Sequence, residues 1–545
     1  MPSPDARTAA DLAGIALAFG ARDVAGWSDA EERLARTASR PDPAVVRRLR
    51  AELLDGGDPL GERFCALRSA ELRRPLGATY TPAPIVRAML AWARRQRPLP
   101  SRIVDPGAGS GRYLLAAAAT FPDAELVGVE IDPLAAMLAR GDLAAIGAGA
   151  RTTVHLADFR ACTLPRTTGP TLFVGNPPYV RHHRLDERWK RWLVDRASSL
   201  GCRASQLAGL HVHFFVATAI HARPGDRGAY VTAAEWLDVN YGRLVRDLLM
   251  GVLGATGIHV LEPAAQPFAD AATTAAITCF EVGRRPPSLR VRRVETLDDL
   301  GALDGGRSIR RDRLEAAPRW SPLLATRRGP DGPRSGGRPP VGYVELGDLC
   351  RVHRGAVTGA NAIWIVDGAT DVPESFLHPT VTKARELFAA GAELLDASSL
   401  RRVIDLPIDL DTLDDDDRAR VERFLRRAAT MGAKAGYIAR TRRAWWSVGL
   451  RAPAPILATY MARRPPAFVR NRAQARHINI AHGLYPRLPL SATALDRLAD
   501  YLATRTSVAD GRTYAGGLTK FEPREMERLL VPDPDLLVAS DAPRA

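Results

Sequence analysis

The sequence predicts an α/β protein whose main domain is a doubly wound, mostly parallel sheet of seven strands. Three observations predict it. Short apolar runs alternate with amphipathic helical patterns between residues 75 and 285. A glycine-rich turn at residues 105–111 follows the first run and opens a helix, as in nucleotide-binding α/β folds. Residues 327–340 are rich in Pro, Gly and Arg, a composition typical of a linker to a second domain.

Seven apolar runs of strand length give the expected sheet. They lie at residues 101–105, 125–131, 153–156, 172–174, 228–233, 258–261 and 275–282. Helical patterns lie between or beside them at residues 85–93, 112–120, 134–146, 206–222 and 239–252. Only residues 262–274 separate the last two strands, which is too short a connection for a helical crossover. We therefore expect the last strand to be antiparallel.

Five segments make up the expected domain organisation. Residues 1–74 form an N-terminal helical segment, with helices at residues 11–19, 28–37 and 42–54. The main domain spans residues 75–285, and a connecting segment with the linker spans residues 286–340. Residues 341–534 mix β-rich runs such as 362–366 with a helix at 414–430, which predicts an α+β second domain. Residues 535–545 form a tail.

Composition narrows the class of protein. The chain has 545 residues, 46% apolar and 25% charged, as in globular proteins. Its 76 basic and 61 acidic residues give a net charge of +15, which indicates a polyanionic partner, nucleic acid first. The five cysteines include no C-x-x-C pair, which argues against a zinc ribbon or disulfide scaffold and fits a reducing cytoplasm. No apolar run reaches the ~18 residues of a membrane span.

A short apolar run ends in Asn176-Pro177-Pro178-Tyr179. Two prolines stop the strand and stiffen the chain, at the carboxyl edge where open α/β sheets place their chemistry. Asn176 Oδ1 and the Pro177 carbonyl can each accept an N–H, and Tyr179 can stack on a planar ring. The four residues suit a planar substrate with an amino group. An ordinary strand-ending turn is the alternative.

The glycine-rich turn reads Asp105-Pro106-Gly107-Ala-Gly109-Ser-Gly111. Glycines let a ligand approach the backbone, and the helix that follows offers N–H donors. The spacing is not the G-x-G-x-x-G of NAD sites, and no Gly-Lys-Ser/Thr follows as in a phosphate loop. Dinucleotides and adenosylmethionine are the ligands that such turns bind.

Three acidic positions follow the next two strands. Glu130 ends the second strand, where an acid accepts the hydroxyls of a ribose. Asp132 precedes Pro133 and is expected to cap the following helix. Asp158 can accept an adenine amino group and Phe159 can pack on a ring, although a role in the turn is equally open.

Two further positions have both a structural and a binding interpretation. Thr81, before Pro82, is read as a helix N-cap or as a cofactor contact. Phe268 lies in a polar loop, where it either anchors the loop or stacks on the second face of a base. His211 and His213 are two positions apart, a poor spacing for metal ligands on a helix, so we expect no metal site.

Loops of the second domain combine basic, aromatic and glycine residues. They are candidates for contact with phosphates and bases, with ordinary exposed loops as the alternative. The candidate DNA-binding residues are Arg464, Arg470, Asn471, Lys520 and Phe521.

Taken together, the motifs resemble those of the gamma class of adenine-N6 DNA methyltransferases, the TaqI-like type found in restriction–modification systems. The matching stretches come in that class's order: Gly77-Ala-Thr-Tyr-Thr-Pro82, the turn at 105–111, Gly128-Val-Glu-Ile-Asp-Pro133, Ala157-Asp-Phe159, Gly175-Asn-Pro-Pro-Tyr179 and the Phe268 loop. The resemblance is close over residues 75–285. It is weaker over residues 341–534, which resemble the family's target-recognition domain.

The resemblance implies a class I methyltransferase fold, S-adenosylmethionine as cofactor and duplex DNA as substrate. It implies that Asn176 and Pro177 bind the amino group of a flipped-out adenine, and that Tyr179 and Phe268 stack on the base. The residues implied to hold the cofactor are Thr81, the turn at 105–111, Glu130, Asp132, Asp158, Phe159 and Asn176. A separately encoded restriction endonuclease is an implied partner.

Three alternatives stay open. A methyltransferase that acts on RNA or on a protein glutamine amide shares the Asn-Pro-Pro-Tyr motif but predicts no long second domain. A non-catalytic DNA-binding specificity subunit predicts damaged motifs, whereas every motif residue is intact. A fused restriction enzyme requires a nuclease motif, and residues 1–74 carry none.

Overall fold

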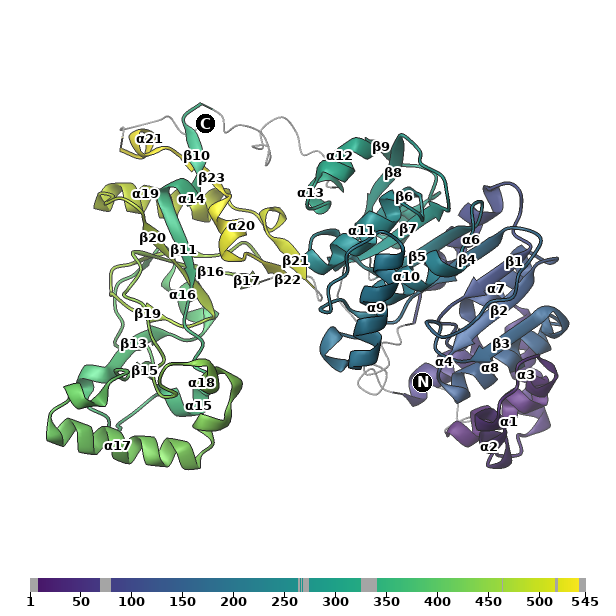
Figure 1. Ribbon diagram of the computed structural model, residues 1–545, viewed down its shortest axis with the longest axis horizontal. Coiled ribbons are helices and arrows are strands. Elements are labelled where there is room, and N and C mark those ends of the chain that lie inside the picture. Colours follow the sequence, from purple (N-terminus) through teal and green to yellow (C-terminus); the bar gives the residue numbers. More distant parts are fainter. Residues whose placement is uncertain are drawn as a thin grey trace. The chain divides into compact units, whose positions relative to one another are not determined.

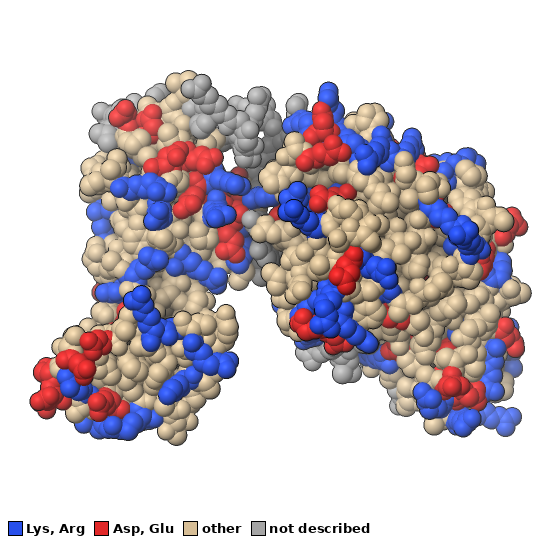
Figure 2. Space-filling view, viewed as in Figure 1, with Lys and Arg blue, Asp and Glu red and all other residues tan. Residues whose placement is uncertain are grey.

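The computed structural model describes residues 8–68, 80–262, 265, 267, 274–324, 341–462, 464–514 and 518–538. The chain forms two compact units, whose helices and strands are labelled in Figure 1. Unit 1 comprises residues 1–327 with 515–517, and unit 2 comprises residues 328–514 with 518–545. Within the described residues, no helix is long and apolar enough to cross a membrane. Lys and Arg side chains are spread over both units in Figure 2, with Asp and Glu among them.

Unit 1 begins with four helices, each started by a recognisable cap. They are α1 (Ala9–Phe19), α2 (Asp29–Arg36), α3 (Pro43–Leu54) and α4 (Pro59–Leu67). Thr8 and Ser28 form capping boxes, and Asp42 and Asp58 cap helices that start with proline. The three helices expected from the sequence are confirmed, and α4 is an additional helix.

The sheet of unit 1 has nine strands. They are β1 (Arg102–Asp105), β2 (Glu125–Glu130), β3 (Thr152–Leu156), β4 (Thr171–Gly175), β5 (Arg227–Ala233), β6 (Ala255–Leu261), β7 (Ala275–Glu281), β8 (Ser288–Val294) and β9 (Arg307–Arg310). Their order is β3-β2-β1-β4-β5-β7-β6-β8-β9. The pairs among β1 to β5 are parallel, and β7 is antiparallel to β5 and β6, which confirms the expected orientation of the last of the seven strands.

The seven-stranded expectation is corrected by β8 and β9, which lie in the segment expected to connect the two domains. β8 pairs parallel to β6, and β9 pairs antiparallel to β8. Leu289, Val291 and Val294 of β8 are buried, and arginines lie between them. Alternating apolar and basic residues are the pattern of an edge region with one covered face, so the sheet extends beyond residue 285.

Helices cover both faces of the sheet (Figure 1). They are α6 (Ala83–Arg95), α7 (Arg112–Thr120), α8 (Pro133–Ala145), α9 (Glu187–Ser199), α10 (Leu210–His221), α11 (Arg243–Met250), α12 (Arg311–Ala316) and α13 (Ser321–Leu324). Ile103 and Leu126 pack with α6 and α7, whereas Val104 and Val127 pack with α10 and α11. Adjacent residues of one strand face opposite layers, so two cores enclose the sheet.

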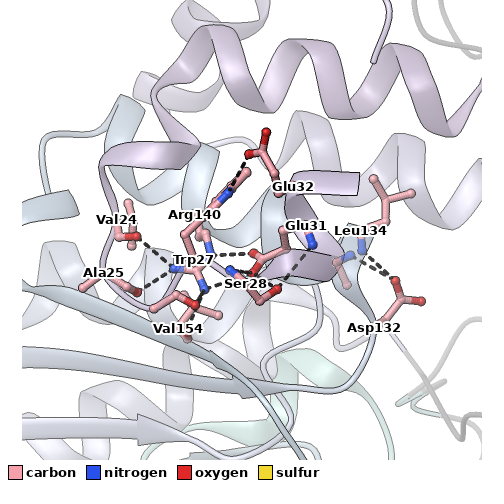
Figure 3. A network of polar contacts seen from close by, with 12 residues as sticks. Val24, Ala25, Trp27, Ser28, Glu31, Glu32, Asp132, Leu134, Arg140 and Val154 are labelled. Atoms are coloured by element: carbon pink, nitrogen blue, oxygen red, sulfur yellow. Dashed lines mark hydrogen bonds and ion pairs between the residues drawn. The ribbon is translucent and has the colours of Figure 1, made fainter. Parts of the chain in front are cut away.

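Helix α8 joins the N-terminal helices to the sheet. The guanidinium of Arg140 donates to Glu31 and to the backbone carbonyls of Val24, Ala25, Gly26 and Val154, as Figure 3 shows in part. The Nε–Oε1 distance to Glu31 is 2.6 Å, and both side chains are fully buried. A Cβ on Gly141 of α8 would lie 2.8 Å from Ala16 Cα on α1, so the two helices approach at glycine.

Unit 2 is α+β, as expected from the sequence. Its strands are β10 (Tyr343–Glu345), β11 (Cys350–Arg354), β12 (Ile365–Val366), β13 (Leu377–Val381), β14 (Glu393–Leu394), β15 (Arg402–Ile404), β16 (Ile456–Thr459), β17 (Met461–Ala462), β18 (Phe468–Asn471), β19 (Arg476–His477), β20 (Ala481–Pro486), β21 (Arg512–Tyr514), β22 (Leu518–Lys520) and β23 (Leu530–Pro532). Its largest sheet has the order β11-β20-β16-β18-β14.

The helices of unit 2 are α14 (Leu346–Leu349), α15 (Asn361–Trp364), α16 (Ala384–Ala390), α17 (Asp415–Thr430), α18 (Tyr437–Thr441), α19 (Ala492–Arg505), α20 (Pro523–Glu527) and α21 (Pro534–Val538). The expected helix at 414–430 is confirmed as α17. The β-rich run at 362–366 is only partly a strand, because residues up to Trp364 form α15 and only β12 is extended. Trp364 is buried by aromatic neighbours on α17 and nearby, which stabilise the short helix.

Candidate functional site

The glycine-rich turn between β1 and α7 forms one wall of a cleft at the carboxyl edge of the sheet. Gly109 and Gly111 have φ angles of +53° and +93°, in the left-handed region that favours glycine. A Cβ on Gly111 would lie 3.0 Å from Ala139 Cβ on α8. Pro106 and Gly107 line the same cleft, whose empty space of about 1160 Å³ includes open solvent. Its position at the carboxyl edge of the sheet suits a nucleoside-like ligand.

Asp105 is fully buried at the end of β1. Its Oδ1 accepts a hydrogen bond from Gly107 N at 3.3 Å, and its Oδ2 has no partner within the described part of the chain. Burial raises the pKa of Asp105 to about 8. Pro106 and Gly107 line the cleft but Asp105 itself does not. The raised pKa favours the protonated acid at neutral pH, which lowers the cost of burying this group.

Glu130 holds the cleft wall from the second strand. Its Oε2 accepts from Gly109 N at 2.7 Å, and its Oε1 accepts from Ile131 N and Asp132 N at 2.8 and 2.9 Å. Burial raises the pKa of Glu130, although these three backbone donors oppose the rise. The carboxylate therefore fixes the glycine-rich turn and also faces the cleft.

Asp132 caps α8, as the sequence predicts. Its Oδ1 accepts from Leu134 N at 2.9 Å and Ala135 N at 3.3 Å, and its Oδ2 is paired with Arg68 of the N-terminal segment. Asp132 still lines the cleft. Its carboxylate already caps α8 and pairs with Arg68, so a cofactor that contacts Asp132 would share this carboxylate with both.

Asp158 is held by a neighbour that the sequence analysis did not single out. Arg160 donates to Asp158 Oδ1 from Nε at 2.9 Å and to Oδ2 from Nη2 at 2.6 Å. Burial alone would raise the pKa of Asp158, but Arg160 lowers it overall. Phe159 is buried against Phe214, at a ring distance of 5.6 Å, and both line the cleft.

The Asn176-Pro177-Pro178-Tyr179 turn leaves β4 beside the glycine-rich turn, because β1 and β4 are parallel neighbours. Asn176 Nδ2 donates to Thr81 Oγ1 at 3.1 Å. The Tyr179 hydroxyl lies 2.8 Å from Asn176 Oδ1 and 3.2 Å from the Val231 carbonyl. Burial raises the pKa of Tyr179 well above its usual range, so the phenol keeps its proton. The Asn176 amide is thereby fixed in one orientation.

Thr81 does not cap a helix, which corrects one of its two interpretations. Helix α6 has Pro82 as its N-cap residue and no side-chain cap. The Thr81 hydroxyl instead accepts from Asn176, and its carbonyl accepts from Arg112 Nη1 at 3.2 Å. Thr81 is buried and lines the cleft, so it joins the N-terminal side of the domain to the Asn176 turn.

Helix α4 is a wall of the cleft that the sequence analysis missed. Phe64 and Cys65 line the cleft from this helix, and Arg68 lines it directly after the helix ends. Arg112, at the start of α7, pairs with Asp58 at 2.9 Å and stacks on the Tyr80 ring at 3.3 Å. The Asp58-Pro59 pair predicts the start of α4, but its ion pair with Arg112 spans 54 residues and has no local signal.

Phe268 lies outside the described residues. His211 and His213 are buried in α10, and burial lowers the pKa of His213 to about 3. No group of three His, Cys, Asp or Glu that could hold a metal ion occurs among the residues the structure describes.

Unit 2 corrects the expectation that the candidate DNA-binding residues lie on exposed loops. Arg470 is buried on β18 and donates to Asp496 Oδ1 at 2.6 Å. Asn471 is buried and bonds to backbone groups of Ala454 and Ala475, and Phe521 lies in a hydrophobic core. Lys520 is paired with Glu522. Arg464 is exposed, over the Phe388 ring at 3.4 Å, and stays a candidate.

Comparison with known proteins places this architecture in a family. A model described as the C-terminal domain of Type II methyltransferase M.Eco57I matches residues 341–544. The Type II methyltransferase M.XamI of Xanthomonas campestris pv. amaranthicola is 50% identical over 537 residues, which cover 96% of this chain and 98% of that protein. The chain belongs to the Type II DNA methyltransferases of restriction–modification systems. The family resemblance read from the motifs is thereby confirmed.

One solved structure and one further relative match this chain more distantly. The solved structure of the Type IIL restriction–modification enzyme MmeI in complex with DNA has a TM-score of 0.56 and 14% identity, and covers 93% of this chain and 78% of that chain. This likeness supports the fold. A tRNA1(Val) (adenine(37)-N6)-methyltransferase of Porphyromonas gingivalis is 32% identical over 127 residues, which cover 22% of this chain and 50% of that protein.

Proposed function

We propose that this methyltransferase transfers a methyl group from S-adenosylmethionine to N6 of an adenine in duplex DNA. The observation that carries the proposal is the Asn176 amide, fixed by Thr81 and Tyr179 beside the cleft of the glycine-rich turn. The relative whose name states adenine-N6 methylation supports the choice of atom. The family supports DNA as the polymer.

The cleft has the chemistry to hold S-adenosylmethionine, which supplies a methyl group on a sulfonium ion. Glu130 suits the ribose hydroxyls, and Phe159 and Phe214 offer apolar rings to the adenine part. Gly109, which donates to Glu130, has no side chain that would occupy the open space of the cleft.

The Asn176 turn has the chemistry to bind an amino group. Asn176 Oδ1 and the Pro177 carbonyl are acceptors for the two N–H groups of adenine N6, and Tyr179 and Phe268 are the proposed stacking residues. Removing the base from the duplex costs a few kcal/mol, which stacking and these hydrogen bonds offset. Two acceptors draw the nitrogen toward a tetrahedral geometry, so the residues act by positioning and electrostatics.

The test is transfer of a labelled methyl group to DNA, RNA and protein substrates by the purified chain, followed by nucleoside analysis. We expect N6-methyladenine in duplex DNA, formed about 100-fold or more slowly by the Asn176→Ala control variant. Labelled cytosine would overturn the choice of atom. Transfer only to RNA or to a glutamine amide would favour one of the two other methyltransferase alternatives, and no transfer at all would favour the non-catalytic subunit.

Replacing Glu130 by glutamine should weaken cofactor binding by about 1.5–3 kcal/mol, because a charged acceptor becomes neutral. The NH2 group of glutamine would also face a backbone N–H that in the wild type donates to a carboxylate oxygen. Glu125, exposed at the start of the same strand, gives the matched control, Glu125→Gln. Calorimetric titration with S-adenosylmethionine checks both. Equal affinity of the two variants would move the ribose contact elsewhere.

We propose further that unit 2 selects the DNA site. The Asn176 turn can read one adenine and nothing around it, so neighbouring bases must be read by other side chains in a groove. The match of residues 341–544 to the M.Eco57I C-terminal domain supports a shared role for this unit. A restriction endonuclease with the same site is the proposed partner in the cell.

Exchanging residues 341–545 for the matching part of a relative that methylates a different site should transfer that relative's preference. Each protein is incubated with a randomised DNA pool, and methylated adenines are read by single-molecule sequencing. A chimaera that keeps the parent preference would place site choice in unit 1.

A further inference from the structure

A basic excursion leaves the domain directly after the Asn176 turn. The backbone N–H of Leu210 donates to the carbonyl of Val180 at 2.9 Å, so residues 181–209 leave and return at one point beside Tyr179. The excursion carries seven basic and three acidic side chains, a net charge of +4, besides two histidines. Its basic residues are Arg181, Arg184, Arg188, Lys190, Arg191, Arg196 and Arg203.

The inner face of this excursion is fixed to the domain by aromatic side chains of α9. The Arg160 guanidinium lies 3.8 Å from the centre of the Trp189 ring. The Trp192 ring is parallel to His213, with an interplanar angle of 6° and a centroid distance of 6.0 Å. Leu193 is fully buried on the same face. The backbone of α9 is therefore held firmly, although its outer side chains are in solvent.

The outer face carries exposed arginines. Arg181, Arg184 and Arg191 have no ion pair within 4 Å in the part of the chain that the structure describes, although Arg191 interacts electrostatically with Glu187. Arg188 has a 3.7 Å contact to Asp186, with both side chains 72% exposed, and lies 5.1 Å from the centre of the Trp189 ring. Figure 2 shows Lys and Arg side chains gathered over α9, with some Asp and Glu beside them. Most surface arginines are simply solvated, but these lie next to the proposed site of base binding.

We propose that residues 181–191 bind the phosphodiester backbone of the DNA that flanks the target adenine. The proposal rests on the proposed function. A base that leaves its stack needs the neighbouring phosphates held in place, and arginine binds phosphate in a planar, bidentate geometry. Arg181 is two residues from Tyr179, and the packed aromatic side chains of α9 hold the backbone that carries Arg191. Because phosphate contacts carry no sequence information, this surface adds affinity and register, while unit 2 supplies the preference.

The test replaces Arg181, Arg184 and Arg191 by glutamine in the full-length protein. Affinity for a labelled, unmethylated duplex of about 30 base pairs is measured at several KCl concentrations. One duplex contains the site that the enzyme methylates, and the other lacks it. Each lost phosphate contact lowers the slope of log K against log[KCl] by about 0.9, so the triple variant should lose about 2 to 3 units. Both duplexes should weaken by the same factor.

Two controls separate charge from structure. The Arg→Lys variants at the same three positions should keep the slope, because lysine keeps the charge. Glutamine at Arg33, Arg40 and Arg47, exposed on or beside the N-terminal helices, removes three charges elsewhere and should leave the slope unchanged.

The outcomes distinguish this proposal from the proposed function. Wild-type protein that methylates no DNA contradicts the function. Wild-type protein that methylates DNA, together with an Arg→Gln variant of unchanged salt slope, overturns the phosphate surface. A slope that falls equally with the N-terminal control variant also overturns it, because the effect then belongs to net charge.

Discussion

Replacing Asn176 by alanine should slow methyl transfer by about 100-fold or more and leave cofactor affinity largely intact. The amide oxygen is the proposed acceptor for the amino group, and its contribution grows as the nitrogen becomes tetrahedral in the transition state. An interaction that strengthens in the transition state lowers the rate of the chemical step when it is lost. Single-turnover transfer of labelled methyl, with calorimetric titration of S-adenosylmethionine, measures the two quantities separately.

Thr81→Val is the matched comparison for this variant. It removes the hydroxyl that accepts from Asn176 Nδ2 but leaves the amide oxygen and the Tyr179 contact in place. We expect a smaller loss of rate than with Asn176→Ala, because the amide is then less firmly oriented but still present. If both variants transfer methyl groups at the wild-type single-turnover rate, the amino group is bound by other residues.

The sheet and its central turns could be predicted because their signals are local. Apolar runs that end in Gly or Pro, such as those before Asp105 and Asn176, predict strands and their ends from a few residues. Asp132 before Pro133 predicts a helix cap for the same reason. Strands β8 and β9 were missed because β8 has as many arginines as apolar residues and β9 has more, so neither forms an apolar run. Both are held in the sheet by long-range pairing, β8 with β6 and β9.

Several residues that line the cleft were named from local motifs, whereas Arg160, the α4 wall and the contacts between these residues were not. The contact between Asn176 and Thr81 joins residues 95 positions apart. The contact between Arg112 and Asp58 joins residues 54 positions apart. Local sequence patterns cannot predict contacts over such separations. The same limit explains the error at Arg470. An arginine beside an asparagine reads as a phosphate contact, whereas its partner Asp496 lies 26 residues further on and pairs with it within the domain. Long-range pairing decides which arginines are left for DNA.

Arg140 is a further long-range contact, and its expected effect is on stability. Its guanidinium satisfies Glu31 and four backbone carbonyls in a fully buried place, and one side chain thereby fixes the N-terminal helices to α8 and β3 (Figure 3). Breaking a buried ion pair by removing one partner leaves the other charge without solvent or counter-charge. The carbonyls also lose their donors.

Arg140→Ala should therefore lower the free energy of unfolding of unit 1 by about 3–5 kcal/mol. Calorimetric unfolding of the full chain measures it, with cofactor affinity as a second readout because α4 of the same N-terminal segment lines the cleft. Arg140→Lys should lie between wild type and alanine, since one ammonium cannot reach all the acceptors. The double variant Arg140→Met with Glu31→Gln should cost less than the sum of its single variants, because no unpaired charge is left. Additive losses, or a loss below about 1 kcal/mol for alanine, would show that the N-terminal helices are held by their apolar contacts with α8 rather than by this network.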